Sequence, residues 1–483
     1  MPHTLSTLIS PENFQVKILK HFNHEPSMGQ DRLFYAFTRF IFSDKPRLAL
    51  LIKGYAGTGK TTSVSAMVRT LKELNQKVIL LAPTGRAAKV LGNYSGHTAW
   101  TIHRQIYTRV QESGFSYFSL RENEHENTVF FVDEASMIGT EKIGGMRGDG
   151  GSGDLLDDLI TYVMNGEGCR LVLIGDAAQL PPIGSDQSPA LNLALLQSRY
   201  FLNIAELELS EVIRQAEGSG ILANATAIRK LITSASAELP HFQLNDYNDI
   251  KLVTGDLQGD VEDAFANFGK EDTIIITRSN KRANLFNQQV RARILWHEEE
   301  INSSDRMMVL KNNYFWLDGK NPYGAGFIAN GDVIVVQRIR KFEERGAFRF
   351  ARATISMVDY PDMPEFDVIL LCNTIWEESA SLSQTKLSEL GNLIAEDYAH
   401  IPNLGQRKRA VYQDEYYNAL EVKFAYAITC HKAQGGQWPC VFVDQGYIND
   451  EMVGVELNRW FYTAVTRASL ELHLVGFDEK LLA

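Results

Sequence analysis

Residues 54–61 read GYAGTGKT, and this octapeptide decides the fold. It follows the apolar run LALLI at 48–52 and precedes SVSAMVRTLKEL at 63–74, which has the apolar spacing of a helix. A glycine-rich turn between a buried strand and a helix lets backbone N–H groups surround phosphate oxygens. In such a loop Lys60 neutralises the β- and γ-phosphates and the Thr61 hydroxyl binds Mg²⁺.

Two further apolar strands end in polar residues of the kind that a nucleotide site needs. VFFVDEAS at 129–136 ends in two carboxylates, of which Asp133 can bind Mg²⁺ and Glu134 can polarise an attacking water molecule. LVLIG at 171–175 continues as GDAAQLPPIG, which places Gln179 at the carboxyl edge of the sheet, beside the γ-phosphate. These residues predict a nucleoside triphosphatase.

Apolar runs alternate with helical stretches along most of the chain, which predicts an α/β fold with parallel sheets. The first block holds LALLI, VILLA, VFFVD, LVLIG and IAELEL, up to residue 209. A second block begins at TIIIT (273–277) and resumes with KFAYAIT and CVFVD near residues 423–444. Between its two parts, the runs DVIVVQRI, FRFARATISMV and FDVILLC predict a small β-rich insertion.

Composition excludes several classes of protein. The 483 residues are 45% apolar, and the net charge is 48 − 59 = −11, so any nucleic-acid groove must be basic only locally. No apolar run is long enough to cross a membrane and the N-terminus lacks the pattern of a signal peptide, so we expect a cytoplasmic protein. The four cysteines have no CxxC spacing and are expected to be small buried side chains.

Nine segments, in this order, resemble superfamily 1 DNA helicases of the RecD-like and Dda type, the branch that moves 5′ to 3′. They are GYAGTGKTT (54–62), APTGRAAKVL (82–91), TIH (101–103), VDEASM (132–137), GDAAQLPPI (175–183), LSEVIRQ (209–215), ANGD (329–332), AITCHKAQGGQ (427–437) and YTAVTRA (462–468). The resemblance implies two RecA-like P-loop domains in tandem, with a β-hairpin insertion in the first and an SH3-like insertion in the second.

The same resemblance implies domain boundaries. The N-terminal segment and first RecA-like domain would occupy 1–208, with a strand-separating hairpin at about 104–128. The second RecA-like domain would comprise 209–332 and 423–483, and the SH3-like insertion 333–422. A loop with six glycines at 143–154 has no assigned role.

Residue roles also follow from the resemblance, for ATP and Mg²⁺ as cofactors. Catalysis would use Lys60, Glu134, Gln179 and the arginine pair Arg214 and Arg467, and the metal would be held by Thr61 and Asp133. The nucleotide would be bound by Gln30, Gly54, Gly57, Thr58, Gly59, Lys60, Thr61, Thr62, Gln434 and Gly435.

A single DNA strand would contact Pro83, Thr84, Thr101 and His103 in the first domain and Thr429, His431 and Lys432 in the second. We call these seven residues the track. The hairpin aromatics Phe115, Tyr117 and Phe118 would either stack on the last base pair or cover the hairpin by packing.

The expected function is an ATP-dependent DNA helicase that acts on single-stranded and forked DNA, without a membrane, as a monomer. The alternative is a P-loop ATPase that serves as a switch or scaffold on DNA and does not unwind it. Such a switch requires neither AITCHKAQGGQ nor YTAVTRA, so these two segments favour the motor.

Overall fold

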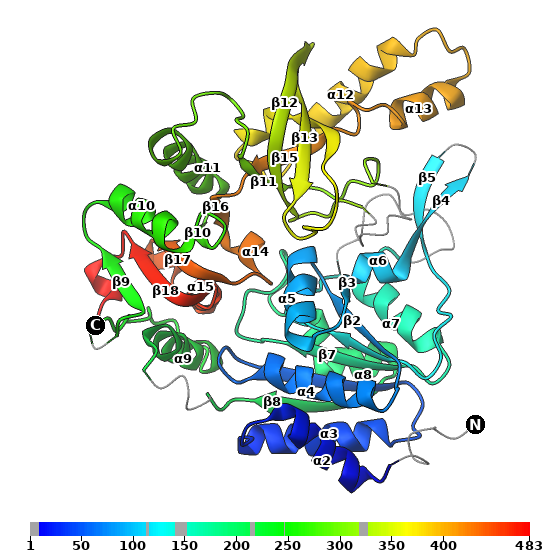
Figure 1. Ribbon diagram of the computed structural model, residues 1–483, viewed down its shortest axis with the longest axis vertical. Helices are drawn as coiled ribbons and strands as arrows, with labels where there is room; N and C mark the ends of the chain where they lie inside the picture. Colours follow the sequence, from blue (N-terminus) through cyan, green and yellow to red (C-terminus); the bar gives the residue numbers. More distant parts are fainter. Residues whose placement is uncertain (1–8, 113–114, 141–151, 213–217, 246, 318–326) are drawn as a thin grey trace. The chain divides into compact units, whose positions relative to one another are not determined.

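The computed structural model describes residues 9–112, 115–140, 152–212, 218–245, 247–317 and 327–483. The chain divides into two compact units (Figure 1). Unit 1 comprises Met1–Val110, Tyr117–Tyr247 and Met452–Thr466. Unit 2 comprises Gln111–Ser116, Asn248–Glu451 and Arg467–Ala483. Among the described residues, no helix has the length and apolar character needed to cross a bilayer.

Unit 1 is built on a six-stranded parallel sheet with the order β3-β2-β6-β7-β1-β8. Its strands are β1 (Leu48–Gly54), β2 (Val78–Ala82), β3 (Ala99–Thr101), β6 (Val129–Val132), β7 (Arg170–Gly175) and β8 (Asn203–Leu209). The apolar runs noted in the sequence form all but the shortest of these strands. The inner strands β1, β6 and β7 lack a polar alternation because both faces of the sheet are covered there, whereas the edge strand β8 alternates apolar and acidic residues and is largely exposed.

Helices cover the two faces of this sheet in separate sets. Leu50, Ile52 and Phe131 point to a core shared with α2 (Pro11–Phe22), α3 (Met28–Ile41) and α4 (Lys60–Glu73). The alternate residues, such as Leu51, Phe130 and Leu173, pack against α6 (Ile102–Ile106), α7 (Leu155–Asn165) and α8 (Leu193–Tyr200). The remaining helices of the unit are α5 (Gly85–Ser95), α9 (Gly220–Thr233) and α15 (Val455–Val465).

Unit 2 contains a second parallel sheet, with the order β16-β10-β17-β18-β9. Its strands are β9 (Ile250–Val253), β10 (Thr273–Thr277), β16 (Ala427–Thr429), β17 (Trp438–Asp444) and β18 (Ala468–Val475). Its helices are α10 (Leu257–Phe268), α11 (Asn280–Gln289) and α14 (Cys430–Ala433). The two parallel sheets, each accompanied by helices, confirm the expected α/β fold.

A closed five-stranded barrel is inserted in unit 2. It consists of β11 (Arg306–Val309), β12 (Val333–Arg345), β13 (Phe348–Met357), β14 (Phe366–Leu371) and β15 (Leu420–Phe424). Between β14 and β15 the chain forms α12 (Gln384–Asp397) and α13 (Leu404–Tyr412). Barrel residues such as Val336 and Val368 share one apolar core with Ile275 and Phe442 of the parallel sheet.

The structure places two boundaries differently from the sequence-based expectation. The barrel starts at β11, before residue 333, because the four-residue run RMMV pairs with both β12 and β15 and closes the barrel. Unit 1 continues to Tyr247 rather than ending at 208, and it also includes α15, because α9 packs against α15. The expected hairpin is present as β4 (Tyr107–Glu112) and β5 (Phe115–Leu120). Its Ser113–Gly114 turn and most of the 143–154 loop lie outside the described residues.

Candidate active site

The GYAGTGKT segment forms the loop between β1 and α4. Gly57 and Gly59 have φ values of 75° and 74°, a conformation that strains a residue with a Cβ atom. A Cβ atom on Gly54 would lie 2.7 Å from Cγ of Lys60, so that side chain crosses directly over the glycine. The Lys60 ammonium donates to the carbonyls of Gly54 at 2.6 Å and Tyr55 at 2.9 Å. The loop therefore has the strand-loop-helix setting of a phosphate site, with the lysine inside it.

The threonines of the loop have different environments. Thr58 is buried and its hydroxyl donates to the Tyr55 carbonyl at 2.8 Å, which tightens the turn. Thr61 is half-buried in the first turn of α4, and Thr62 is exposed. Only Thr61 combines a hydroxyl with partial burial at the start of the helix, as the metal-ligand prediction requires.

Asp133 and Glu134 follow β6, which pairs with β7. Glu134 has a φ of 52°, and its N–H donates to Oδ1 of Asp133 at 2.9 Å. Burial, with the nearby Glu134 carboxylate, raises the pKa of Asp133 to about 7, and the Lys60 charge acts in the opposite direction. A second positive charge beside Lys60 would favour the ionised forms of Asp133 and Glu134. The hard oxygen donors of Asp133 and Thr61 fit Mg²⁺ by their chemistry.

The segment after β7 lies next to the acidic pair. A Cβ atom on Gly175 would be 2.9 Å from the Ser136 nitrogen, so the two strand ends are in close contact. Asp176 is 1% exposed, and its Oδ2 lies 3.9 Å from the Lys60 ammonium. Gln179 is buried and, within the described part of the chain, its Oε1 has no hydrogen-bond partner. A buried carbonyl oxygen without a partner fits a residue that contacts water or ligand there.

Helix α15, which carries most of YTAVTRA, reaches these segments within unit 1. The Tyr462 hydroxyl accepts from the Ala56 N–H at 2.8 Å and donates to Oδ2 of Asp176 at 2.7 Å. The Thr463 hydroxyl accepts from the Leu180 N–H at 2.8 Å. The helix thus connects the phosphate loop to the residues that follow β7.

Arg459 adds a third contact from α15, donating to the Gln179 carbonyl at 3.2 Å. The sequence-based site omitted Arg459, Tyr462, Thr463 and Asp176. Tyr462 and Thr463 stand inside a motif that had been noted only for its arginine, and Asp176 begins the motif that had been noted for Gln179. The sequence contained the signal, but only the fold shows that the motifs touch.

Gln30 lies beside the phosphate loop. Its Nε2 donates to the Thr58 carbonyl at 3.3 Å, and its Oε1 accepts from the Ser27 N–H at 2.9 Å. Ser27 in turn accepts from the Gln30 N–H, which completes a capping box at the start of α3. The nucleotide contact of Gln30 stays a prediction, separate from this structural role.

Of the predicted arginine pair, Arg467 belongs to the described residues. Arg467 belongs to unit 2, is buried, and donates through Nη1 to the Gly436 carbonyl at 3.1 Å. This places Arg467 next to the predicted nucleotide contacts Gln434 and Gly435, of which Gly435 has a φ of 72°. Arg214 lies outside the described residues.

Two of the four track residues of unit 1, Thr84 and Thr101, cap helices. The Thr84 hydroxyl accepts from the Ala87 N–H at 3.2 Å, and the Thr101 hydroxyl accepts from the Arg104 N–H at 3.3 Å. Burial lowers the pKa of His103 to about 4, so its ring is neutral at pH 7. Pro83, at the end of β2, is half-buried. The two caps hold the Thr84 and Thr101 side chains at the carboxyl ends of β2 and β3, and the DNA contacts of all four residues stay predictions.

The track residues of unit 2 surround α14. Thr429 ends β16, and His431 and Lys432 lie in the short helix that follows. The Lys432 ammonium donates to Oδ1 of Asn330 at 2.5 Å, which joins α14 to the ANGD segment. Burial and the nearby Lys423 charge lower the pKa of Lys432 to about 8.

The hairpin aromatics Phe115, Tyr117 and Phe118 lie in β5. Their side chains are outside the part of the structure that is described, so both the stacking and the packing interpretations stay predictions.

Comparison with known proteins finds matches over both halves of the chain. Residues 37–241 match an AAA domain, and residues 424–475 match the UvrD-like helicase C-terminal domain. The ATP-dependent RecD2 DNA helicase of Deinococcus radiodurans is 34% identical over 176 residues, which are 36% of this chain and 21% of that protein. The chain thus spans about a fifth of the length of that relative.

Two viral proteins match over most of their length. The ATP-dependent DNA helicase dda of Enterobacteria phage T4 is 23% identical over 92% of this chain and 98% of its own. Uncharacterized protein R530 of Acanthamoeba polyphaga mimivirus is 24% identical over 90% and 96%. A solved structure of Bacteroides Pif1 in complex with ADP-AlF3 and ssDNA has 14% identity and a TM-score of 0.48 over 95% of each chain. The domain and sequence matches confirm the resemblance to superfamily 1 helicases of the RecD-like and Dda type.

Proposed function

We propose that this chain is an ATP-driven DNA helicase that moves 5′ to 3′ along single-stranded DNA. The observation that carries the proposal is the set of contacts from α15 to the phosphate loop and to Asp176. A stationary ATPase needs the loop, the acidic pair and Gln179. A stationary ATPase does not need a helix such as α15, which contacts the phosphate loop and leads directly into the segment that ends in Arg467.

Each residue of the site has a defined task in this proposal. Lys60 neutralises phosphate charge and Glu134 polarises the attacking water molecule, while the free Oε1 of Gln179 orients that water or senses the γ-phosphate. Mg²⁺, held by Thr61 and Asp133, supplies charge neutralisation when it is bound. Arg467 stabilises the transition-state charge, with Arg214 as its partner.

The proposed movement along DNA depends on the track. Capped strand ends in unit 1 and the α14 segment in unit 2 offer hydroxyls, backbone groups and one ammonium to a DNA strand. Relatives with the names RecD2 and dda are described as DNA helicases, which supports DNA as the substrate. We also propose that the protein acts in the cytoplasm as a monomer, which sedimentation with and without DNA would test.

An unwinding assay decides between the motor and the stationary ATPase. Duplexes that carry either a 5′ or a 3′ single-stranded tail are incubated with and without ATP. We expect strand separation only with the 5′ tail and only with ATP. ATP hydrolysis without separation of either duplex would support the switch or scaffold, and separation restricted to the 3′ tail would reverse the proposed direction.

A further inference from the structure

Two neighbouring strands of unit 2 bring a thiol, a carboxylate and an imidazole together. Cys440 lies in β17, and Glu471 and His473 lie in β18, the parallel strand that pairs with it (Figure 1). The register pairs Cys440 with Glu471, and His473 follows two residues later on the same face of β18. One potential ligand atom from each side chain lies within 4.8 Å of the other two. Among the described residues, this is the one group of three such side chains at that spacing.

The thiol of this group is buried and the imidazole is fixed. Cys440 is 0% exposed, and within the described part of the chain its thiol forms neither a disulfide nor a hydrogen bond. The buried His473 ring stacks on Phe442, with ring centroids 4.3 Å apart, which fixes its orientation. A single buried thiol is an ordinary small apolar side chain. This one differs because a carboxylate and an imidazole lie beside it.

Glu471 connects the group to solvent, because its side chain is 29% exposed. Its Oε2 lies 3.2 Å from Nε2 of His473 and accepts from the Lys251 ammonium at 2.8 Å. Both contacts use Oε2, and Oε1 makes no hydrogen bond with the described residues. The Lys251 side chain is 51% exposed, so its ammonium can turn to water while the carboxylate takes a different cation.

The mixture of ligand atoms selects the metal. Sulfur and nitrogen ligands suit Zn²⁺, whereas Mg²⁺ and Ca²⁺ prefer oxygen alone. Ligand atoms around a tetrahedral Zn²⁺ lie roughly 3.3–3.6 Å apart, a spacing that His473 and Glu471 nearly have already. Burial lowers the pKa of His473, which leaves the neutral ring that binds metals. Burial, with the Glu471 charge nearby, raises the pKa of the Cys440 thiol to about 12, so a bound Zn²⁺ would replace the thiol proton.

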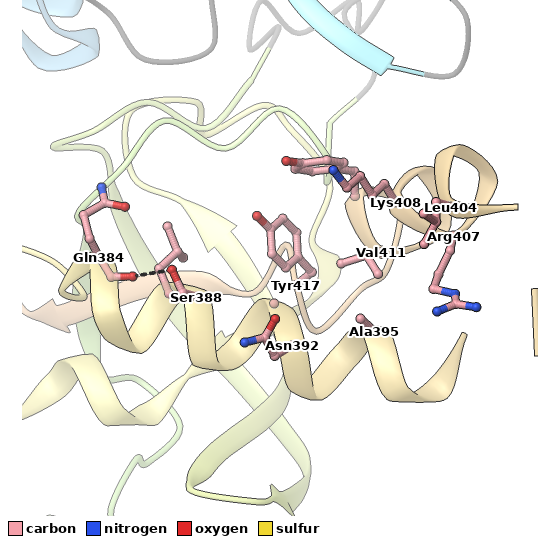
Figure 2. Close-up of a pocket in the computed structure, with 12 residues that line it drawn as sticks. Gln384, Ser388, Asn392, Ala395, Leu404, Arg407, Lys408, Val411 and Tyr417 are labelled. Carbon is pink, nitrogen blue, oxygen red and sulfur yellow. Dashed lines mark hydrogen bonds between the residues drawn. The ribbon is translucent and has the colours of Figure 1, made fainter. Parts of the chain in front are cut away.

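The groove between α12 and α13 lacks this chemistry, although it is a larger space (Figure 2). Its volume is about 510 Å³, and its charged side chains are Arg407 and Lys408. None of the described residues that line it is a cysteine, a histidine, an aspartate or a glutamate. A cation therefore finds suitable ligands between β17 and β18 and not in this groove.

We propose that Cys440, Glu471 and His473 form a binding site for Zn²⁺ in unit 2. The ion joins β17 to β18, and water fills the fourth position of the tetrahedron. Because β18 begins at Ala468, directly after Arg467, the ion stabilises the strand that follows the proposed arginine finger. The site goes beyond the proposed helicase function, since it binds metal without nucleotide or DNA. No CxxC spacing announces it, because its ligands come from two separate strands.

Cobalt provides a spectroscopic test on the full-length chain. Metal-free protein is titrated with Co²⁺ in excess Mg²⁺ and without nucleotide, and Zn²⁺ is then added as a competitor. We expect the absorption bands of a tetrahedral cobalt thiolate, and their loss when Zn²⁺ is added. Cys440→Ser should remove the thiolate band, and Glu471→Gln, which keeps the shape of a half-buried side chain, should weaken Zn²⁺ binding at least about tenfold. Cys372→Ser, at another buried cysteine of unit 2, is the matched control and should bind as the wild type does.

Lys251→Gln adds a change in the opposite direction. Without the competing ammonium on Glu471, Zn²⁺ affinity should rise about threefold, which a group that serves only as an ion-pair network does not predict. Zn²⁺ should also raise the unfolding temperature of the wild type by about 2–4 °C, and not that of Glu471→Gln. Absence of the thiolate band in the wild type would overturn the proposal. So would equal Zn²⁺ affinities of the wild type, Cys440→Ser and Glu471→Gln, or a loss of binding shared by Cys372→Ser.

Discussion

The Tyr462 hydroxyl donates a 2.7 Å hydrogen bond to the buried Asp176 carboxylate, although 286 residues separate the two in the sequence. The same hydroxyl accepts from the Ala56 N–H of the phosphate loop. One oxygen atom therefore links three motifs of the proposed nucleotide site. Because these hydrogen bonds join the three segments, we propose that Tyr462 is a positioning residue for the motor, one that keeps the phosphate loop and Asp176 in register.

Removal of this hydroxyl should uncouple the motifs while leaving the packing intact. In Tyr462→Phe the ring stays in the core, but Asp176 loses a donor, which costs about 1–3 kcal/mol of stability. We expect DNA-stimulated ATP turnover to fall roughly tenfold, with ATP affinity changed less. Turnover and thermal unfolding are compared with Tyr447→Phe, a change at a tyrosine that is 78% exposed. Wild-type turnover in Tyr462→Phe would exclude the positioning role.

The phosphate loop and the acidic pair allow a sharper test of catalysis. Lys60→Ala and Glu134→Gln both remove charge that acts on the phosphates or on the attacking water, so we expect turnover to fall by about 10³ or more. Glu134→Gln should still bind ATP, because the lysine remains in the loop. Nucleotide affinity is measured with a fluorescent ATP analogue alongside turnover, and an unfolding curve confirms that each variant is folded. Substantial turnover in either variant contradicts the assignment.

Arg467 is expected to act on the transition state. Arg467→Ala should lower DNA-stimulated turnover by about 10³, as the loss of an arginine finger does. The residue also donates to the Gly436 carbonyl, so Arg467→Lys serves as a control that retains a donor and a charge at this site. If the lysine variant recovers the fold and ATP binding but not turnover, the guanidinium is catalytic. Parallel losses of ATP binding and turnover in Arg467→Ala would indicate a structural role.

Much of the fold could be predicted because its central strands are continuous apolar runs. LALLI, VFFVD and TIIIT are buried on both faces, so their composition alone marks them as inner strands of parallel sheets. The strand β11 could not be recognised in this way, because four residues carry little periodic signal and its place depends on pairing with β12 and β15.

In the candidate site, too, residues within local motifs could be predicted, and contacts that depend on the tertiary structure could not. Lys60, Glu134 and Gln179 follow strands and carry their chemistry in local motifs, so the sequence identifies them. The role of Tyr462 depends on α15 packing in unit 1 rather than with the strand that follows it, and no local pattern encodes that choice. Thr84 and Thr101, two predicted DNA contacts, also cap the helices that follow them, and the structure shows those caps.

A buried carboxyl group of the barrel predicts a pH-dependent stability. Burial, with the nearby Asp359, raises the pKa of Asp332 to about 8. A pKa that is higher in the folded state stabilises the fold at low pH, and this contribution is lost as the pH rises through 8. The unfolding temperature of the wild type should therefore fall between pH 6 and pH 9.

Asp332→Asn should remove that dependence. An amide oxygen can still accept from the Ala329 N–H, which lies 2.7 Å from Oδ2, and the variant carries no charge at any pH. We expect it to be more stable than the wild type at pH 9, by on the order of 2 kcal/mol. The exposed Asp362→Asn is the matched control, and it should follow the wild-type curve. An identical pH profile for all three proteins would show that Asp332 does not titrate in this range.

The last prediction concerns the pH dependence of DNA binding through Lys432. A phosphate contact requires the ammonium form, and the pKa of this lysine is lowered to about 8. Affinity for a short oligothymidine should therefore decrease between pH 7 and pH 9, by about threefold to tenfold. Lys432→Arg keeps its charge over this range, so its affinity should be nearly constant, even if the longer side chain lowers it at pH 7. Lys20→Arg on the exposed surface of α2 is the control and should retain the wild-type pH dependence. If Lys432→Arg loses affinity with pH as steeply as the wild type, another group titrates and Lys432 is not the phosphate contact.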